Sequence, residues 1–160
     1  PVDQSLKNAV ESNVASFVLS RVSALYSGDA VHVLARWDLS PRCVFSDPVV
    51  LSVGAMECAE IFRALKCLSP VSLDTPRLLS VVHEGQSSTR VLVQLRQQYN
   101  HSVEISSVLL VDVDTSDVDH LVITRFEERW NNVPVLENNP FTTVRRLNGV
   151  LSYRLTPVVC

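Results

Sequence analysis

The spacing of apolar residues predicts three helices in the first half of the chain. Apolar positions recur every three or four residues from about Leu6 to Tyr26, which is the pattern of an amphipathic helix. Asp29 is placed to cap a second, shorter helix, which Pro41 closes. The turn at Gly54 precedes a third helix with one apolar side, and this helix ends before Pro70.

Alternation of apolar and polar residues predicts a sheet in the second half. Four extended runs cover about residues 72–83, 89–99, 103–113 and 119–130. Short, turn-rich segments separate the last three runs, so we expect an antiparallel meander. In the second run one side is apolar (Val91, Val93, Leu95 and Tyr99) and the other is polar (Arg90, Gln94, Arg96 and Gln98).

A last helix is predicted near the C-terminus. Asn139 and Pro140 suit the cap and the first position of a helix. Apolar residues from Val144 to Leu151 give this helix one apolar side, interrupted by Gly149. Together with a strand near Asp47, the element order predicts an α+β fold, in which helices cover one face of a curved antiparallel or mixed sheet.

Size and charge narrow the class of protein. At 160 residues, with 46% hydrophobic and 19% charged residues, the chain fits one folded domain. The net charge is -3, and no basic stripe forms beyond Arg145 and Arg146, which argues against nucleic acid binding. The longest aliphatic run, Val108 to Val111, is too short to cross a bilayer.

We expect a soluble, intracellular protein. Because the chain opens at Pro1 and not at Met, an organelle reached through a removed targeting segment fits as well as the cytoplasm.

The cysteines and histidines give no sign of a metal site. Cys43, Cys58, Cys67 and Cys160 show no CxxC spacing, and the four histidines are scattered. We expect free thiols in a reducing compartment, buried like small apolar residues. The sequence contains no glycine-rich phosphate loop and no Ser-His-Asp order, so we expect neither a cofactor nor a metal.

One carboxylate stands in an apolar row. If residues 43–50 form a strand, alternation puts Cys43, Phe45, Asp47 and Val49 on one face. A carboxylate on an apolar face is unfavourable unless it is paired, protonated or lining a cavity. Asp47 is therefore the first candidate for chemistry. The alternative is that its side chain caps the backbone of the turn around Pro48.

Four motifs in this order form a pattern that is similar to a known family. They are Leu25-Tyr26-Ser27-Gly28-Asp29, then Cys43-Val44-Phe45-Ser46-Asp47-Pro48, then Gly54 with its helix, and Ile123-Thr124-Arg125-Phe126-Glu127-Glu128-Arg129-Trp130. The pattern resembles the nuclear transport factor 2-like superfamily, particularly its SnoaL-like and ketosteroid isomerase-like members. The resemblance covers about residues 6–132, so the chain is expected to be one domain, 1–160, with 131–160 as a C-terminal extension. The segment from Val144 to Gly149 also resembles uncharacterised eukaryotic members.

The resemblance implies a cone, in which a strongly bent sheet wraps a deep apolar cavity closed by the N-terminal helices. The superfamily includes isomerases, dehydratases and cyclases as well as non-catalytic binders, and many members dimerise through the open face of the sheet. By position, Asp47 matches the general base of the isomerase branch. The positions that would stabilise an enolate fall at about Arg21 and near Val113, while Asp112 and Asp114 point to the other face. Ordinary steroid isomerase chemistry is therefore not expected.

The last strand and nearby elements supply further candidates. Trp130 matches a cavity-facing aromatic, and alternation places Glu128, Phe126, Thr124, Val122 and His120 on its face. Glu128 either faces Asp47, which would raise at least one carboxyl pKa and suit acid-base work, or pairs with an arginine near the rim. His83 is a further candidate proton carrier. The predicted catalytic residues are Asp47, Glu128 and His83, and the predicted ligand-binding residues are Tyr26, Trp37, Phe45, Phe62, Phe126, Trp130 and His120.

Three functions remain open at this point. In the first, the cavity binds a small hydrophobic molecule, and Asp47 with Glu128 or His83 performs proton transfer, isomerisation or dehydration on it. In the second, the cavity binds a ligand without turnover. In the third, side chains fill the cavity and the open face of the sheet docks a second copy or another protein. A cavity lined by unpaired polar groups favours the first function, a dry apolar cavity the second, and a collapsed one the third.

Overall fold

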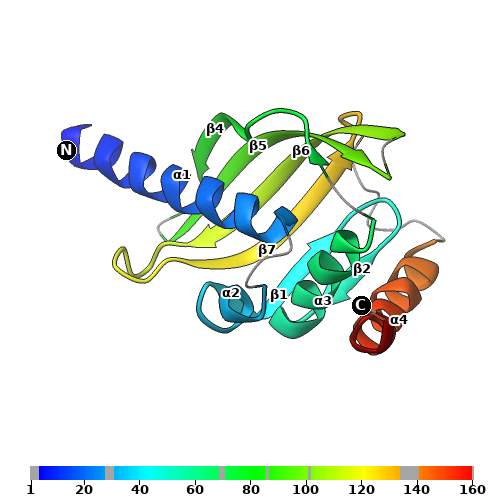
Figure 1. Cartoon of the computed structure of the whole chain (residues 1–160). Coiled ribbons are helices and arrows are strands. Elements are labelled where there is room, and N and C mark those ends of the chain that lie inside the picture. The colour runs from blue at the N-terminus through cyan, green and yellow to red at the C-terminus, as the bar shows by residue number, and fades with distance from the viewer. Residues whose placement is uncertain are drawn as a thin grey trace.

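The computed structural model describes residues 4–27, 31–68, 71–85, 87–100, 102–133 and 141–159. These residues form helices and strands in the predicted α+β order (Figure 1). In chain order the elements are α1 (Gln4–Ser27), α2 (Val31–Trp37), β1 (Leu39–Ser46), β2 (Leu51–Val53), α3 (Ala55–Lys66), β3 (Val71–Ser72), β4 (Arg77–His83), β5 (Ser88–Tyr99), β6 (Val103–Asp114), β7 (Val122–Trp130) and α4 (Thr142–Val159). The expected helix caps Asp29, Asn139 and Pro140 lie outside the described residues.

The described strands form one mixed sheet. Its order is β2-β1-β7-β6-β5-β3, and β4 also pairs with β5. Strands β5, β6 and β7 form the predicted antiparallel meander. Strand β1 runs parallel to β7, so the mixed form of the predicted sheet is the one adopted.

The N-terminal helices cover one face of this sheet. Figure 1 shows α1 running across the sheet, while α2, α3 and α4 are grouped beside β1 and β2. Val14, Val18 and Val22 of α1 are buried because their spacing places them on one side of the helix. They belong to the same core as Val91 and Val93, which point inward from β5. The periodicities in the sequence therefore predict both layers of the core correctly.

Two of the strand predictions are wrong. The run 72–83 is interrupted between Ser72 and Arg77, and Pro76, which has no N–H for a ladder, lies in the gap. The run 43–50 is not one strand, because β1 ends at Ser46 and the chain turns back into β2, which pairs antiparallel with β1. Strand β1 also begins before Pro41, where its pairing with β7 shifts register.

Helix α4 docks through a side that is not its apolar one. Val144, Leu147 and Leu151 are exposed, with 43–55% of each residue accessible. Arg145 and Gly149 are buried instead. Gly149 does not interrupt the helix. A Cβ at this position would overlap the carbonyl oxygen of Leu51 in β2, so glycine allows the two backbones to approach.

The cysteines differ from the expectation of four free thiols. Cys67 is disulfide-bonded. Cys43 and Cys58 are free and fully buried, and Cys160 lies outside the described residues. The expectation is wrong for Cys67 because spacing along the chain does not reveal which thiols the fold brings together.

In the described part of the chain, none of the helices is both long enough and apolar enough to cross a bilayer.

Gly149→Ala should destabilise the protein by about 1–3 kcal/mol, because the new methyl group forces α4 away from β2. Urea unfolding measures this free energy, and Leu147→Ala on the exposed side of the same helix is the matched control. Equal unfolding midpoints for Gly149→Ala and the wild type would show that α4 does not rest on Leu51.

Candidate functional site

A pocket of about 500 Å³ opens between one end of the sheet and helices α3 and α4. Its walls come from the turn after β1, the second half of α3, the facing ends of β5 and β6, the end of β7, and α4. The apolar residues of the lining are Val49, Val50, Ile61, Ala64, Leu65, Leu68, Val103, Ile105 and Trp130, and the polar ones are Asp47, Glu128, Tyr99, Asn100 and Ser152. The pocket is thus mainly apolar, and two carboxylates belong to its wall.

Asp47 begins the turn after β1 and is only 6% exposed. Its Oδ1 accepts hydrogen bonds from the backbone N–H of Val49 at 2.7 Å and of Val50 at 2.5 Å. This carboxylate therefore caps the turn, as one interpretation of the sequence held. The same side chain lines the pocket, as the other interpretation held. The two roles are compatible because both N–H bonds go to one oxygen.

Burial dominates the electrostatics of Asp47. Loss of water raises the pKa of this carboxyl to about 6, against the lowering effect of the two N–H bonds. Glu128 raises the pKa of Asp47 further by charge repulsion, and Arg145 opposes it weakly. The group therefore changes its charge close to neutral pH.

Glu128 faces the same pocket from β7 and is also buried. The hydroxyl of Tyr26 in α1 donates a hydrogen bond of 2.6 Å to Glu128 Oε2. Burial raises the pKa of Glu128, although hydrogen bonds from Tyr26, Ser107 and Trp130 oppose the shift. Burial and the nearby Glu128 hold the pKa of Tyr26 well above its usual value. Among the described residues Glu128 has neutral partners and no arginine, so the rim ion pair considered from the sequence does not form.

Tyr99 lines the pocket, although it is not among the site residues predicted from the sequence. Its hydroxyl donates a hydrogen bond of 2.6 Å to Gln97 Oε1, and burial raises its pKa. The signal was present, because Tyr99 closes the buried row of β5. A tyrosine at the end of such a row combines an apolar ring with a polar tip, which suits the mouth of a cavity.

Arg145 of α4 is the second residue that sequence reasoning missed. Its guanidinium donates to the backbone oxygen of Asp47 at 2.8 Å, to Ser46 Oγ at 2.5 Å and to the backbone oxygen of Val50 at 3.4 Å. Asn148, one turn further along α4, donates to the backbone oxygen of Val49 at 2.9 Å. The turn that carries Asp47 is therefore clamped from outside by α4, which a basic pair in the sequence does not reveal.

The predicted ligand-binding phenylalanines lie deeper than the pocket. Phe45, Phe62 and Phe126 are fully buried. The ring of Phe62 packs edge to face with those of Tyr26, Phe45 and Phe126, with centroid distances of 5.2 to 5.7 Å. The rings of Phe45 and Phe126 are tilted to each other, with their centroids 6.4 Å apart. None of the three is part of the pocket lining. They fill the interior of the cone, and Trp130 is the predicted aromatic residue that does line the pocket.

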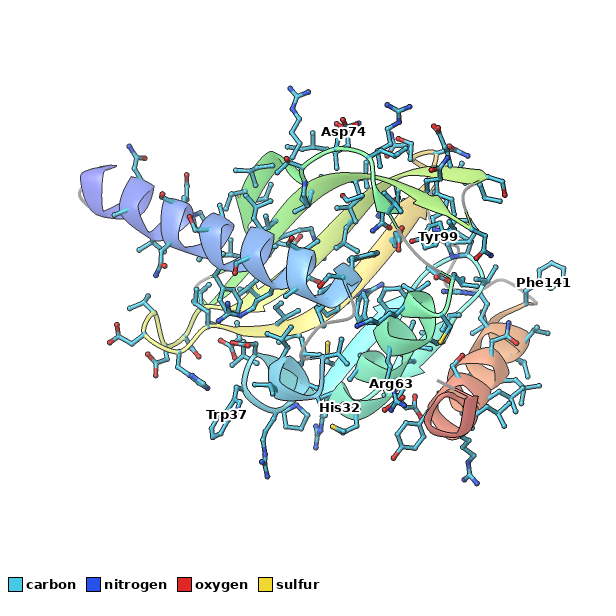
Figure 2. The ribbon with its side chains drawn as sticks, viewed as in Figure 1. His32, Trp37, Arg63, Asp74, Tyr99 and Phe141 are labelled. Carbon is cyan, nitrogen blue, oxygen red and sulfur yellow. The ribbon has the colours of Figure 1, made fainter. Side chains whose placement is uncertain are left out.

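Three other predicted site residues lie elsewhere. Trp37 and His120 line a wider hollow of about 870 Å³ beside α2. Trp37 is 61% exposed, and Figure 2 shows it pointing away from the sheet on another side of the molecule from Tyr99. His83 of β4 contacts Glu11 of α1 and Thr89 of β5, each at 3.1 Å, and is not part of either hollow.

A register shift explains why His120 does not share the inward face of Glu128. The pairing of β6 with β7 slips between Asp112 and Val113, which reverses the alternation in the first part of β7. Leu121 and Ile123 are buried there in place of His120. The predicted face holds only from Phe126 to Trp130.

The outer face of the sheet carries cross-strand ion pairs. Arg90 binds Asp112 through two hydrogen bonds of 2.7 and 3.0 Å, and Arg96 lies 3.1 Å from Glu104. Asp112 thus points away from the pocket, as its position in the strand predicts. Arg21 also does not line the pocket, and its Nε lies 3.1 Å from Asp38 Oδ2.

Among the described residues, no group of three His, Cys, Asp or Glu side chains is arranged so that it could hold a metal ion.

Asp47→Asn should raise the stability of the protein at pH 8. The pKa of Asp47 is raised in the folded state, so the stability that its protonated form provides is lost as the pH rises through about 6. Asparagine keeps the turn-capping oxygen but carries no buried charge. The gain in free energy of unfolding should be up to about 3 kcal/mol at pH 8 and close to zero below about pH 4. Denaturant titrations at both pH values measure it, and a destabilised variant at pH 8 contradicts the burial of the charge.

Arg145→Met should loosen the turn without unfolding α4. The lost hydrogen bonds should lower the local opening free energy by about 1–3 kcal/mol, so the amides of Val49 and Val50 should exchange roughly ten times faster or more. Hydrogen exchange followed by NMR measures this. Arg146→Met, which breaks the ion pair of Arg146 with Glu57 at 2.7 Å, is the control and should leave both amides protected. Equal exchange in both variants would remove Arg145 from the clamp.

Comparison with known proteins rests on structure. No family model and no curated protein matches the chain. A ketosteroid isomerase-like protein from Erwinia carotovora atroseptica matches 76% of this chain and 94% of its own, with 14% identity and a TM-score of 0.58. A domain of unknown function with a cystatin-like fold from Nostoc punctiforme matches 81% of this chain and 80% of its own, with 18% identity and a TM-score of 0.61.

A third solved structure, a nuclear transport factor 2-like protein of unknown function from Shewanella oneidensis, matches 74% of this chain and 97% of its own, with 11% identity and a TM-score of 0.55. These similarities extend over most of each chain at low identity, so they concern the fold. The chain therefore has the cone fold of the nuclear transport factor 2-like and ketosteroid isomerase-like proteins.

Proposed function

We propose that this protein binds a small, mainly apolar molecule in the 500 Å³ pocket and that Asp47 accepts a proton from it. One observation carries the proposal: a carboxylate that is 6% exposed, with a pKa of about 6, lies on the wall of a mainly apolar pocket. Pockets of a few hundred Å³ with apolar walls and a few convergent polar groups are the usual form of small-molecule sites.

The environment of Asp47 suits a general base. A base works best when its pKa lies near the working pH, because it is then ionised and still holds a proton well. Burial supplies this pKa by removing water from the anion. Both backbone N–H groups bind Oδ1, and among the described residues Oδ2 has no donor. Oδ2 is therefore the oxygen that is left to meet a proton of the ligand.

Glu128 and Tyr26 provide the complementary group. Removal of a proton beside a carbonyl leaves an enolate oxygen, which needs a hydrogen-bond donor. Burial favours the neutral form of Glu128, and a neutral carboxylic acid can donate such a bond. Tyr26 fixes the orientation of this carboxyl through Oε2. The pair supplies a donor that the residues at Arg21 and Val113 do not.

The open pocket also supports ligand binding over a collapsed interior. The aromatic cluster of Phe45, Phe62 and Phe126 fills the interior of the cone but leaves the space beside Asp47 free. Binding without turnover is the second candidate, and the predominance of apolar lining residues favours it. Both candidates use the same pocket, so one experiment separates them.

Exchange of the α-protons of 2-indanone in heavy water should be faster in the presence of the protein. This probe is a neutral, apolar ketone that is small compared with the pocket. Asp47→Asn should reduce the protein-dependent rate roughly a hundredfold, the usual contribution of a positioned base. The rate should rise with pH through about 6, since only ionised Asp47 accepts a proton. NMR measures the exchange.

Two further variants complete this test. Trp37→Phe leaves Trp130 as the only tryptophan of the chain, so its fluorescence reports whether 2-indanone enters the pocket. Asp74→Asn removes an exposed carboxylate that does not line the pocket and should leave exchange unchanged (Figure 2). Binding without exchange would support the second candidate, and exchange that is equal with Asp47→Asn and the wild type would exclude Asp47 as the base.

A further inference from the structure

The charges around the pocket are unbalanced. Asp47 and Glu128 both line it, whereas none of its described lining residues is a lysine, arginine or histidine. A buried carboxylate without a cation is unfavourable, and an arriving ligand can supply the missing charge. The pocket therefore has a chemical preference that its apolar walls alone do not give.

Arg145 does not remove this imbalance. Its guanidinium is not part of the pocket lining and donates to three neutral acceptors, namely two backbone oxygens and the hydroxyl of Ser46. At Asp47 the repulsion from Glu128 outweighs the attraction to Arg145. The other titratable groups that act on Asp47 or Glu128 are Tyr99 from β5 and Tyr26 from α1, and burial keeps both of them neutral. Among the described lining residues, no cation therefore offsets the charge of Asp47 at the polar end of the pocket.

We propose that the pocket selects an apolar molecule that carries one basic amine, with its ammonium group bound between Asp47 and Glu128 and its apolar body against α3 and Trp130. An anionic molecule of the same shape would meet two carboxyl groups and no cation. A neutral molecule would gain the apolar contacts but would leave the carboxyl groups without a cation. A molecule with an ammonium group gains the apolar contacts and an ion pair, and the indole of Trp130 is a further favourable surface for its cation. This inference rests on the proposed function only in using the same pocket.

The charge of the ligand determines the direction of the pH dependence. Burial favours the neutral form of Glu128 in the empty pocket, but an ammonium group binds better when both carboxyl groups are ionised. Binding of an amine therefore releases protons from the pocket, and the affinity for an amine should rise with pH. For a pKa of about 6, the ionised fraction of Asp47 increases about tenfold between pH 5 and pH 7.5. The affinity for the amine should increase by a similar factor. A neutral molecule takes water away from Asp47 without pairing it, so its affinity should stay level or fall over the same range.

Three compounds that share the indane ring system test the inference. They are 2-aminoindane (a cation), 2-indanol (neutral) and indane-2-carboxylate (an anion), each titrated calorimetrically against the full chain at pH 5 and pH 7.5. At pH 7.5 the amine should bind at least ten times more tightly than the alcohol, and the carboxylate should bind most weakly. The affinity of the amine should fall about tenfold at pH 5.

Asp47→Asn and Glu128→Gln should each reduce the preference for the amine at least fivefold while leaving the affinity for 2-indanol within about twofold, and Asp74→Asn should change neither. The two pocket variants keep the shape of the side chain, and retained binding of 2-indanol shows that the pocket is intact. Equal affinity for the amine and the alcohol, or an amine affinity that does not change with pH, overturns this inference alone. Failure of all three compounds to bind overturns the proposed function as well.

Discussion

The burial of one charged group, Asp47, is the constraint on which the rest of the site depends. Its carboxylate leaves water because the chain reverses direction between β1 and β2 at this residue. Two backbone N–H groups hold the anion in place but do not offset its desolvation, so its pKa stays raised. Stability is therefore lost at neutral pH, where the buried carboxyl is ionised. Functional sites often carry such a local loss, which the remaining fold tolerates.

The C-terminal helix is hydrogen-bonded to this turn. Arg145 and Asn148 of α4 donate hydrogen bonds to backbone oxygens of the turn. Gly149 lies against the backbone of β2. The apolar residues of α4 are exposed as a consequence, because the close approach at Gly149 fixes the rotation of the helix. Helix α4 also contributes Ser152 to the lining of the pocket.

Much of the fold follows from local patterns. The three- and four-residue spacing of α1 and the alternation of β5 place their core residues correctly, because each pattern extends over many residues of one regular element. The end of β7 also keeps its predicted face, so the sequence places Glu128 toward the interior. Asp47 does line the pocket, but not as part of an apolar strand face, because β1 ends at Ser46 and Asp47 begins the turn that follows.

The remaining features depend on distant segments. The slip between Asp112 and Val113 moves His120 off the inward face, and nothing in the sequence of β7 itself signals it. The contacts of Arg145 require the position of the turn after β1, and those of Gly149 the position of β2, both about a hundred residues earlier in the chain. Tyr26 is a predicted ligand-binding residue, and in the structure its hydroxyl donates a hydrogen bond to Glu128, which lies 102 positions further along the chain.

The pKa of Asp47 is the most direct test of this account. A carbon-13 NMR titration of the side-chain carboxyl in the folded wild type, with Asp47→Asn used to assign the signal, gives the value without any ligand. The account predicts a pKa of about 6. A value close to that of an exposed aspartate, about 3.9, would show that the carboxylate is hydrated, and the pocket would then lack the base on which the proposed function rests.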